Sequence, residues 1–394
     1  MLQIYETKRI VEMVKEIAMQ LRKDEIDIEV VNEISGVMIE INSLLYHATK
    51  LKFQKDHDFS IQEEYIDWLS ELNKNIEIWE KSLQNRSGKK TEAEFWEIYE
   101  TFLYVSEKEI LNSAIQKFKS MPQDVKESYK SLPARYTFLY AVINYEEEDF
   151  SLIEQHVKMM VNHIEDYKWL YEHLQDYRSK RVLNGVILYW FTFDLSALHN
   201  LCETLFRDYY DMDILACDGN EVLVDLGAYI GDSALQFIDT YGKYKKIYAY
   251  EITPDTCVEL KKNLSGYPNV IVKQKGAGKQ SGIMYVNSDE KSAANKLVED
   301  GNVPVEVVSL DEDITENISI IKMDIEGAEK DALLGARKHI ENEKPRLLIS
   351  SYHIPDDIFD IPKLINSIRD DYKFYMRFNG HNGIWPCDYV LFAV

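Results

Sequence analysis

The spacing of apolar residues changes near the middle of the chain. In the first half, apolar residues recur three and four positions apart, beginning with the stretch from Ile10 to Leu21, and this spacing is typical of amphipathic helices. The same spacing predicts further helices at residues 60–84, 91–120, 124–145 and 150–178. We therefore predict an all-helical N-terminal domain at residues 1–148, to which the sequence assigns no role.

In the second half, short β-branched or aromatic runs alternate with helical segments. The runs predicted as strands are VLVDL, IYAYE, VIVKQ, IMYV, VEVVSL, IIKMDI, RLLISSY, FYMRF and YVLFAV. Such alternation is typical of a doubly wound, mainly parallel α/β sheet of the Rossmann-like kind, and the last two runs are expected to form a terminal antiparallel pair. We assign residues 149–394 to this second domain, with a helical lead-in to about residue 218 and a Rossmann-like core at 219–394.

The amino-acid composition restricts the kinds of partner molecule and the cellular compartment that we expect for this protein. The 68 Asp and Glu residues exceed the 45 Lys and Arg residues, and the formal net charge of −23 disfavours nucleic acid and anionic lipid as partners. The longest apolar stretch, from Val182 to Phe193, is shorter than the roughly 20 residues that cross a bilayer. Charged residues interrupt the apolar runs of the N-terminal segment, so we expect no signal peptide or membrane anchor. The four cysteines have no CxxC spacing, which fits a reducing, cytoplasmic location.

A glycine-containing turn follows the first predicted strand, in the sequence DLGAYIGDS from Asp225 to Ser233. Ligands of open α/β sheets bind at such carboxyl ends. Asp225 and Asp232 would oppose a pyrophosphate at close range, whereas they would attract the sulfonium and ammonium of S-adenosylmethionine. Glu251 ends the second predicted strand and is placed to accept hydrogen bonds from both ribose hydroxyls. The alternatives are a Rossmann-like domain without a cofactor and a nicotinamide-dependent enzyme.

The stretch from Lys275 to Gly278 consists largely of small residues and follows the third predicted strand. At Gly276 and Ala277 an adenine ring has room to lie flat against the backbone. The same stretch is equally well interpreted as the entry to a hairpin, so both interpretations stay open.

Three carboxylates lie close together in the sequence IKMDIEGAE, at Asp324, Glu326 and Glu329. On a strand, Asp324 and Glu326 point to the same side. Such a pair can hold the methionyl ammonium, orient an acceptor hydroxyl or bind a divalent cation. In the alternative interpretation Glu329 merely favours a helix N-terminus and Glu326 is a solvated turn residue.

The predicted carboxyl edge of the sheet also carries several candidates for a general base. His353 follows the fifth predicted strand of the core, and a histidine has an ordinary pKa near 6.5. Its alternative role is that of a surface or capping histidine before Pro355. Glu326 or Asp324 are further candidates, as is His381 on the loop between the last two strands.

The segments VDLGAYIGDS, YAYE, VSLDE and above all IKMDIEGAEKDALLGA resemble the FkbM-type S-adenosylmethionine-dependent methyltransferases, from about Asp176 to Val394. The resemblance implies a class I methyltransferase fold and methyl transfer to hydroxyl oxygens of sugars and related natural-product or glycan acceptors. It implies cofactor roles for residues of the turn and strand ends, and it places Glu326 at the reacting centre. Two positions depart from the pattern. Tyr229 stands where the loops of many methyltransferases have a second glycine, and Ser350 or Ser351 stands where many relatives have an acid.

The predicted site thus has two parts. The catalytic candidates are Asp324, Glu326 and His353. The cofactor-binding candidates are Asp225, Gly227, Ala228, Tyr229, Gly231, Asp232, Ser233, Glu251, Gly276, Ala277 and Asp324. No residue is assigned to a metal, although a divalent metal stays an open alternative.

We therefore predict an O-methyltransferase that uses S-adenosyl-L-methionine and acts on a hydroxylated small molecule, saccharide or glycan precursor. One alternative is a methyltransferase for a peptide or protein that docks on the N-terminal helices, which are also the candidate surface for a homo-oligomer. The other alternative is a cofactor-binding scaffold without activity.

Overall fold

A computed structural model describes residues 89–130, 143–144, 147–198, 201, 209–286, 301, 303–379 and 387–394. The chain divides into two compact units, Met1–Lys90 and Thr91–Val394. The predicted helices before residue 89 lie outside the described residues, so the description below concerns the second unit. This unit includes helices that the sequence assigned to the N-terminal domain. The domain boundary predicted near residue 148 stays a prediction, because residues 131–142 and 145–146 beside it are not described.

Helices form the first part of this unit. Residues 91–104 are helical, and a capping box between Ser106 and Glu109 begins the next helix, α4 (Glu107–Lys119). Most of the apolar stretch from Val182 to Phe193 lies in α9 (Tyr177–Thr192), in which most residues from Val182 to Trp190 are buried. Among the described residues, no helix combines the length and the apolar character that a membrane span requires. The helices are α4 (Glu107–Lys119), α5 (Gln123–Lys130), α7 (Ser151–Asn162), α8 (Ile164–His173), α9 (Tyr177–Thr192) and the short 3-10 helix η1 (Leu195–Ala197).

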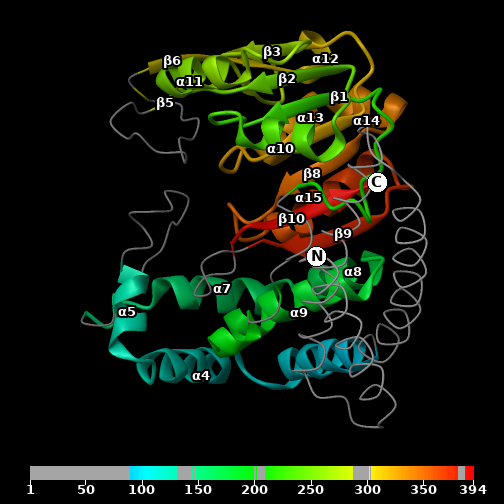
Figure 1. Cartoon of the computed structure of the whole chain (residues 1–394). Coiled ribbons are helices and arrows are strands. Elements are labelled where there is room, and N and C mark those ends of the chain that lie inside the picture. The colour runs from blue at the N-terminus through cyan, green and yellow to red at the C-terminus, as the bar shows by residue number, and fades with distance from the viewer. Residues whose placement is uncertain are drawn as a thin grey trace, which may run out of the picture. The chain divides into compact units, whose positions relative to one another are not determined.

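A seven-stranded sheet in the order β3-β2-β1-β7-β8-β10-β9 forms the centre of the unit (Figure 1). The strands are β1 (Val222–Leu226), β2 (Lys246–Tyr250), β3 (Val270–Lys273), β7 (Ile320–Met323), β8 (Arg346–Ser350), β9 (Phe374–Phe378) and β10 (Tyr389–Ala393). Neighbouring strands are parallel except at β10, which is antiparallel to both β8 and β9. The doubly wound α/β fold and the terminal antiparallel pair are therefore confirmed.

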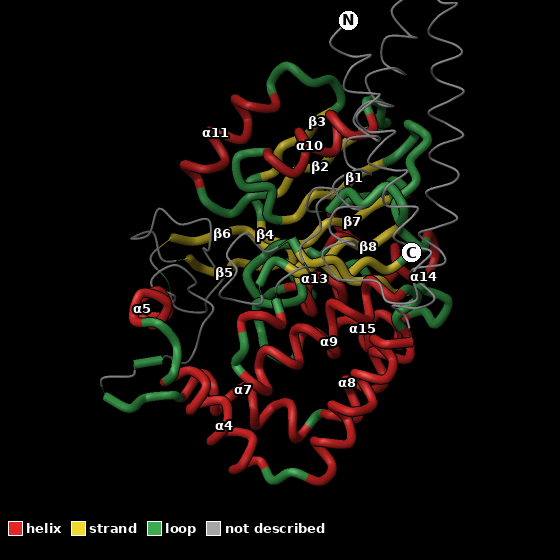
Figure 2. The backbone as a smooth tube through the Cα atoms, turned by 60° about the horizontal axis from the view of Figure 1, so that its bottom comes forward, coloured by secondary structure: helices red, strands yellow, loops and turns green. Residues whose placement is uncertain are grey.

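Helices cover both faces of this sheet (Figure 2). Side chains alternate along a strand, and in β1 Leu223 packs into one apolar cluster with Phe237 of α10 and Leu260 of α11, whereas Val224 belongs to the cluster on the opposite face, with α9, α13 and α15. The helices after β1 are α10 (Asp232–Tyr241), α11 (Pro254–Leu264), α12 (Leu310–Asp313), α13 (Glu329–Gly335), α14 (Arg337–Glu343) and α15 (Asp357–Ile368).

A second, three-stranded sheet has the order β4-β6-β5. The runs IMYV and VEVVSL form its strands β5 (Gly282–Val286) and β6 (Val303–Val308), and β4 contains only Gly276 and Ala277. Because β4 is parallel to β6, the small residues after β3 leave the main sheet and enter this second sheet. The sequence predicted these strands without indicating that they form a separate sheet.

Candidate active site

A cavity of about 370 Å³ lies at the carboxyl ends of β1, β2 and β7. Its lining contains most of the predicted cofactor residues, together with Glu326. They are Gly227, Tyr229, Asp232, Ser233, Glu251, Gly276, Ala277, Asp324 and Glu326. Asp225, Ala228, Gly231 and His353 are not among the lining residues. The predicted residues thus gather around one cavity, with some of them in its walls and others behind those walls.

Gly227 allows the turn after β1 to pass close to the end of β7. Its φ is +74°, and a Cβ at this position would lie 1.9 Å from the carbonyl oxygen of Asp324, so any side chain here would displace the backbone. Tyr229 also has a positive φ, of 45°, and its side chain lines the cavity. Gly231 precedes α10 with a φ of +95°, and a Cβ at this position would lie 3.1 Å from side-chain atoms of Leu260 and Leu264 of α11, so the glycine also allows close packing of α11.

Asp225 is fully buried and already has two partners. Its Oδ1 lies 3.1 Å from Nζ of Lys322, and its Oδ2 accepts a hydrogen bond of 2.6 Å from Ser233 Oγ. Asp225 and Lys322 are directly opposite each other in the register of β1 and β7. Burial would lower the pKa of Lys322, but the charges of Asp225 and Asp324 raise it above its usual value. Asp225 therefore supports the turn from within the protein, beneath the cavity.

Lys322 was missed by reasoning from the sequence. The signal was present, because Lys322 is a lysine within the otherwise apolar strand sequence IIKM, where a buried cation requires a partner. Its ammonium also donates 2.8 Å to the carbonyl oxygen of Gly227 and 3.4 Å to that of Leu226. The three contacts use its three N–H donors and fix the turn to β7.

Glu251 and Asp232 present carboxylates at the ends of β2 and the glycine turn. Glu251 Oε1 accepts a hydrogen bond of 2.7 Å from the backbone N–H of Thr253, and burial raises the pKa of Glu251 despite that bond. Burial also raises the pKa of Asp232, the first residue of α10. Both side chains line the cavity at the positions that the sequence predicted.

Asp324 is held from two sides. The hydroxyl of Tyr209 donates 2.8 Å to its Oδ2, and Nε2 of His353 lies 3.2 Å from its Oδ1. Burial would raise the pKa of Asp324, but His353, with Lys322 and Tyr209, holds it well below its usual range. Tyr209 also lines the cavity and was missed, because it lies outside every strand and helix pattern.

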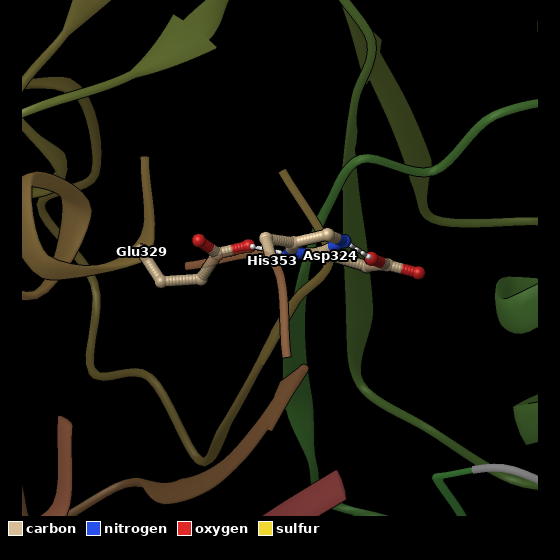
Figure 3. A group of neighbouring side chains, drawn as sticks. All are labelled: Asp324, Glu329 and His353. Carbon is tan, nitrogen blue, oxygen red and sulfur yellow. Dashed lines mark hydrogen bonds and ion pairs between the residues drawn. The ribbon is translucent and has the colours of Figure 1, made fainter. Parts of the chain in front are cut away.

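His353 is buried behind Asp324 and lies between two carboxylates, as Figure 3 shows. Its Nδ1 is 3.0 Å from Oε1 of Glu329, and its Nε2 is also 3.8 Å from Oε2 of Glu326. Burial would lower the pKa of His353, but the carboxylates of Glu329 and Asp324 raise it well above its usual value. Glu329 does begin a helix, as the alternative interpretation expected, and its side chain is fully buried. The Glu326 side chain, for which that interpretation expected solvation, is only 15% exposed.

The ligand atoms of Asp324, Glu329 and His353 lie within 4.8 Å of one another, which is compact enough for a metal site. A histidine binds a metal through a deprotonated ring nitrogen. Here each ring nitrogen of His353 faces a carboxylate oxygen, which is the arrangement of a protonated imidazolium. Both ring nitrogens of His353 are thus in ion pairs with carboxylates, and we assign no metal ligand.

Ser350 and Ser351, which depart from the family pattern, are both fully buried. Ser350 Oγ lies 3.0 Å from the hydroxyl of Tyr209, so Ser350 supports the same tyrosine that binds Asp324. His381 lies outside the described residues.

Comparisons with known proteins place the described site within a region that matches a protein family. Residues 225–376 match the family model of the Methyltransferase FkbM domain. The crystal structure of the methyltransferase FkbM from Methylobacillus flagellatus KT superposes with a TM-score of 0.53 at 26% sequence identity, covering 61% of this chain and 62% of that chain. This chain thus spans less than two thirds of that relative.

Two further solved structures show lower similarity. An rRNA methylase from Streptococcus thermophilus has a TM-score of 0.31 at 16% identity and covers 46% of this chain and 89% of its own. Fibrillarin from Aeropyrum pernix, in complex with natively bound S-adenosyl-L-methionine, has a TM-score of 0.29 at 12% identity and covers 45% of this chain and 67% of its own. No curated protein matches the chain.

The matched residues include the glycine turn and the carboxylate-rich turn after β7, the two motifs that carried the predicted resemblance. They also include the strand ends around the cavity. Residues 225–376 of this chain are therefore identified as an FkbM methyltransferase domain.

Proposed function

We propose that the chain is a methyltransferase that uses S-adenosyl-L-methionine and methylates a hydroxyl group of a saccharide, glycan precursor or related natural product. The observation that carries the proposal is the cavity of the FkbM domain, which four carboxylates line: Asp232, Glu251, Asp324 and Glu326. Its volume of about 370 Å³ lies within the range of small-molecule sites. The nature of the acceptor rests on the family resemblance.

The charges of the cavity favour a cationic ligand over a phosphate-bearing one. The two lysines among its described lining residues, Lys275 and Lys322, are both in ion pairs with carboxylates. A pyrophosphate would therefore meet carboxylates without a cation to receive it. The sulfonium and ammonium of S-adenosylmethionine suit the same lining.

The chain's own residues suggest how such a cofactor is held. Glu251, at the end of β2, is placed to accept from the ribose hydroxyls, and the backbone of Gly276 and Ala277 provides a flat surface for the adenine. The fixed carboxylate of Asp324 faces the cavity and suits the α-ammonium. When bound, S-adenosylmethionine supplies an electrophilic methyl group.

Glu326 is the proposed proton acceptor. It lines the cavity, whereas His353 lies behind the wall, and the raised pKa of His353 keeps its ring protonated. Asp324 is a weak base because its pKa is lowered. S-adenosylmethionine would supply the methyl group and leave as the thioether, and the carboxylate of Glu326 would accept the hydroxyl proton of the acceptor. Catalysis otherwise depends on alignment of the two reactants.

Two experiments test this proposal. Calorimetry with S-adenosylmethionine and with NAD should show binding of the first only, and binding of NAD alone would overturn the choice of cofactor. Incubation with panels of saccharides and peptides, followed by mass spectrometry, should show a gain of about 14 Da on a saccharide, the mass of the CH2 unit that a methylation adds.

Variants decide between an enzyme and a scaffold. Glu326→Gln should abolish the mass gain and retain cofactor binding, because the amide cannot accept the proton. Glu259→Gln, on the exposed side of α11, makes the same chemical change away from the cavity and should leave methylation intact. Methylation of peptides alone would favour the protein-directed alternative, and cofactor binding without methylation of any acceptor would favour the scaffold.

The proposed cytoplasmic location and the proposed docking of a partner or a second copy through residues 1–148 rest on the sequence. They stay predictions.

A further inference from the structure

Glu329 is a buried acid whose role the proposed reaction leaves unexplained. It is the first residue of α13, and its side chain is completely inaccessible to solvent. Its Oε1 accepts a hydrogen bond of 3.0 Å from the backbone N–H of Ile325 and lies 3.0 Å from Nδ1 of His353. A buried carboxylate is costly unless a cation or several donors compensate it. Its position therefore requires a charged partner.

The turn between β7 and α13 brings this carboxylate behind the cavity wall. Glu326 and Gly327 both have positive φ values, 57° and 98°, so the backbone reverses between Asp324 and Glu329. His353 then lies between them, with one ring nitrogen facing each carboxylate (Figure 3). Asp324 lines the cavity, whereas Glu329 and His353 do not.

We propose that Glu329 is a positioning residue: its carboxylate keeps His353 in the imidazolium form, and this imidazolium fixes the carboxylate of Asp324 in the orientation that faces the cavity. The role of Asp324 toward the cofactor rests on the proposed function. The charge state of His353 does not rest on the proposed function, so an experiment can refute either the charge state or the proposed function without refuting the other.

The other charged groups around His353 are consistent with this assignment. Glu326 Oε2 is 3.8 Å from Nε2, and it adds a further negative charge beside the ring. Asp357, at the start of α15, is buried, and burial together with the negative charge of Glu329 raises its pKa to about 7. Lys330 lies 3.0 Å from Asp357 and compensates that carboxylate. The geometry thus makes His353 the cation that lies between Asp324 and Glu329.

Nuclear magnetic resonance of protein with ¹⁵N-labelled histidine tests the charge state directly. The His353 signals are those that disappear in His353→Gln. In the wild-type protein both ring nitrogens should stay protonated from about pH 6 to 8, whereas a free histidine loses its charge near 6.5. Glu329→Gln should let His353 titrate in that ordinary range. Glu329→Asp retains the charge and should keep the ring protonated.

Asp331→Asn is the matched control, because Asp331 is an exposed acid on the same helix. It should leave the His353 signals unchanged. A neutral His353 in the wild-type protein at pH 7 would overturn the proposal, and so would a Glu329→Gln protein in which His353 stays protonated at pH 8. Should Glu329→Gln fail to fold, the wild-type spectrum still decides.

Calorimetry with S-adenosylmethionine tests the consequence for Asp324. In Glu329→Gln, affinity should fall about tenfold or more as pH rises through roughly 6.5, the loss expected when a charged hydrogen bond disappears, and it should recover on acidification. A merely structural defect would weaken binding equally at both pH values. Wild-type protein with a protonated His353 that does not bind the cofactor would refute the proposed function and leave the charge arrangement standing.

Discussion

Gly227 provides a sharp test of the close approach between β1 and β7, because the chain contains a matched control. Gly227 and Gly242 have the same φ of +74°, but a Cβ on Gly227 would lie 1.9 Å from the carbonyl oxygen of Asp324, whereas a Cβ on Gly242 meets no atom within 4 Å. Both alanine variants incur the cost of placing a Cβ at a positive φ, about 1–2 kcal/mol. The Gly227→Ala variant adds a collision with backbone atoms.

The difference between the two variants isolates that collision. Overpacking of a close-packed interior costs about 1–3 kcal/mol, so Gly227→Ala should lose roughly 2–5 kcal/mol in total and Gly242→Ala roughly 1–2. Urea unfolding, followed by circular dichroism and fluorescence, gives the unfolding midpoint of each variant. The midpoints can be compared if the free energy of unfolding depends on urea concentration with the same slope in both variants. Gly227→Ala should also weaken cofactor binding, since Asp324 must move.

Equal destabilisation of the two variants would refute this reasoning. It would mean that the turn after β1 has room beside β7, and that the glycine is present only for its backbone conformation. A Gly227→Ala protein that is less stable but binds the cofactor normally would show that the close contact between β1 and β7 contributes to stability and not to cofactor binding.

Three further predictions concern charges and hydrogen bonds near the cavity. Lys322→Met leaves the buried Asp225 without its cation and should lower the free energy of unfolding in urea by about 3–5 kcal/mol. Adding Asp225→Asn should recover part of that loss. If the stability losses of the two single variants simply added in the double variant, the two residues would not stabilise each other. Asp357 has a folded-state pKa raised to about 7, so the folded protein binds a proton that the unfolded chain releases near 3.9, and this carboxyl makes the protein less stable as pH rises from about 4 to 7. Asp357→Asn should therefore increase the free energy of unfolding at pH 8 by up to about 4 kcal/mol, seen as a higher melting temperature, and should have little effect at pH 4. A larger gain in stability at pH 4 than at pH 8 would contradict this pH dependence. Tyr209→Phe removes the hydrogen bond to Asp324 and should cost about 1 kcal/mol of stability and lower the affinity for S-adenosylmethionine in calorimetry, whereas unchanged affinity would show that His353 alone suffices to hold Asp324.

The sequence predicted the parts of the fold that periodicity encodes. Each apolar run of the second half became a strand, and the turns with Gly227 and Asp324 came to one edge of the sheet because parallel strands share their carboxyl ends. Two-residue β4 was not predictable, because a pair of small residues carries no alternation.

The contacts between the side chains of the site could not be predicted from the spacing of residues along the sequence. The pairing of Asp225 with Lys322 follows from strand register, which a single strand does not specify. Tyr209 reaches Asp324 across 115 positions of sequence, from a segment without periodic pattern. His353 was selected for its ordinary pKa, but the burial of Glu329 changes its charge, and burial in a turn becomes visible only in the folded chain.

The position of β10 between β8 and β9 has a consequence for synthesis of the chain. Strand β9 leaves the ribosome before β10 and has no neighbour in the main sheet until residues 389–393 are made and inserted. During that interval the edge of β8 and the edge of β9 that pair with β10 in the finished protein expose unpaired backbone groups, which are templates for aggregation. A ribosome stalled shortly before Tyr389 would therefore carry a nascent protein that recruits chaperones, whereas one stalled well beyond Val394 by an added linker would carry a closed sheet.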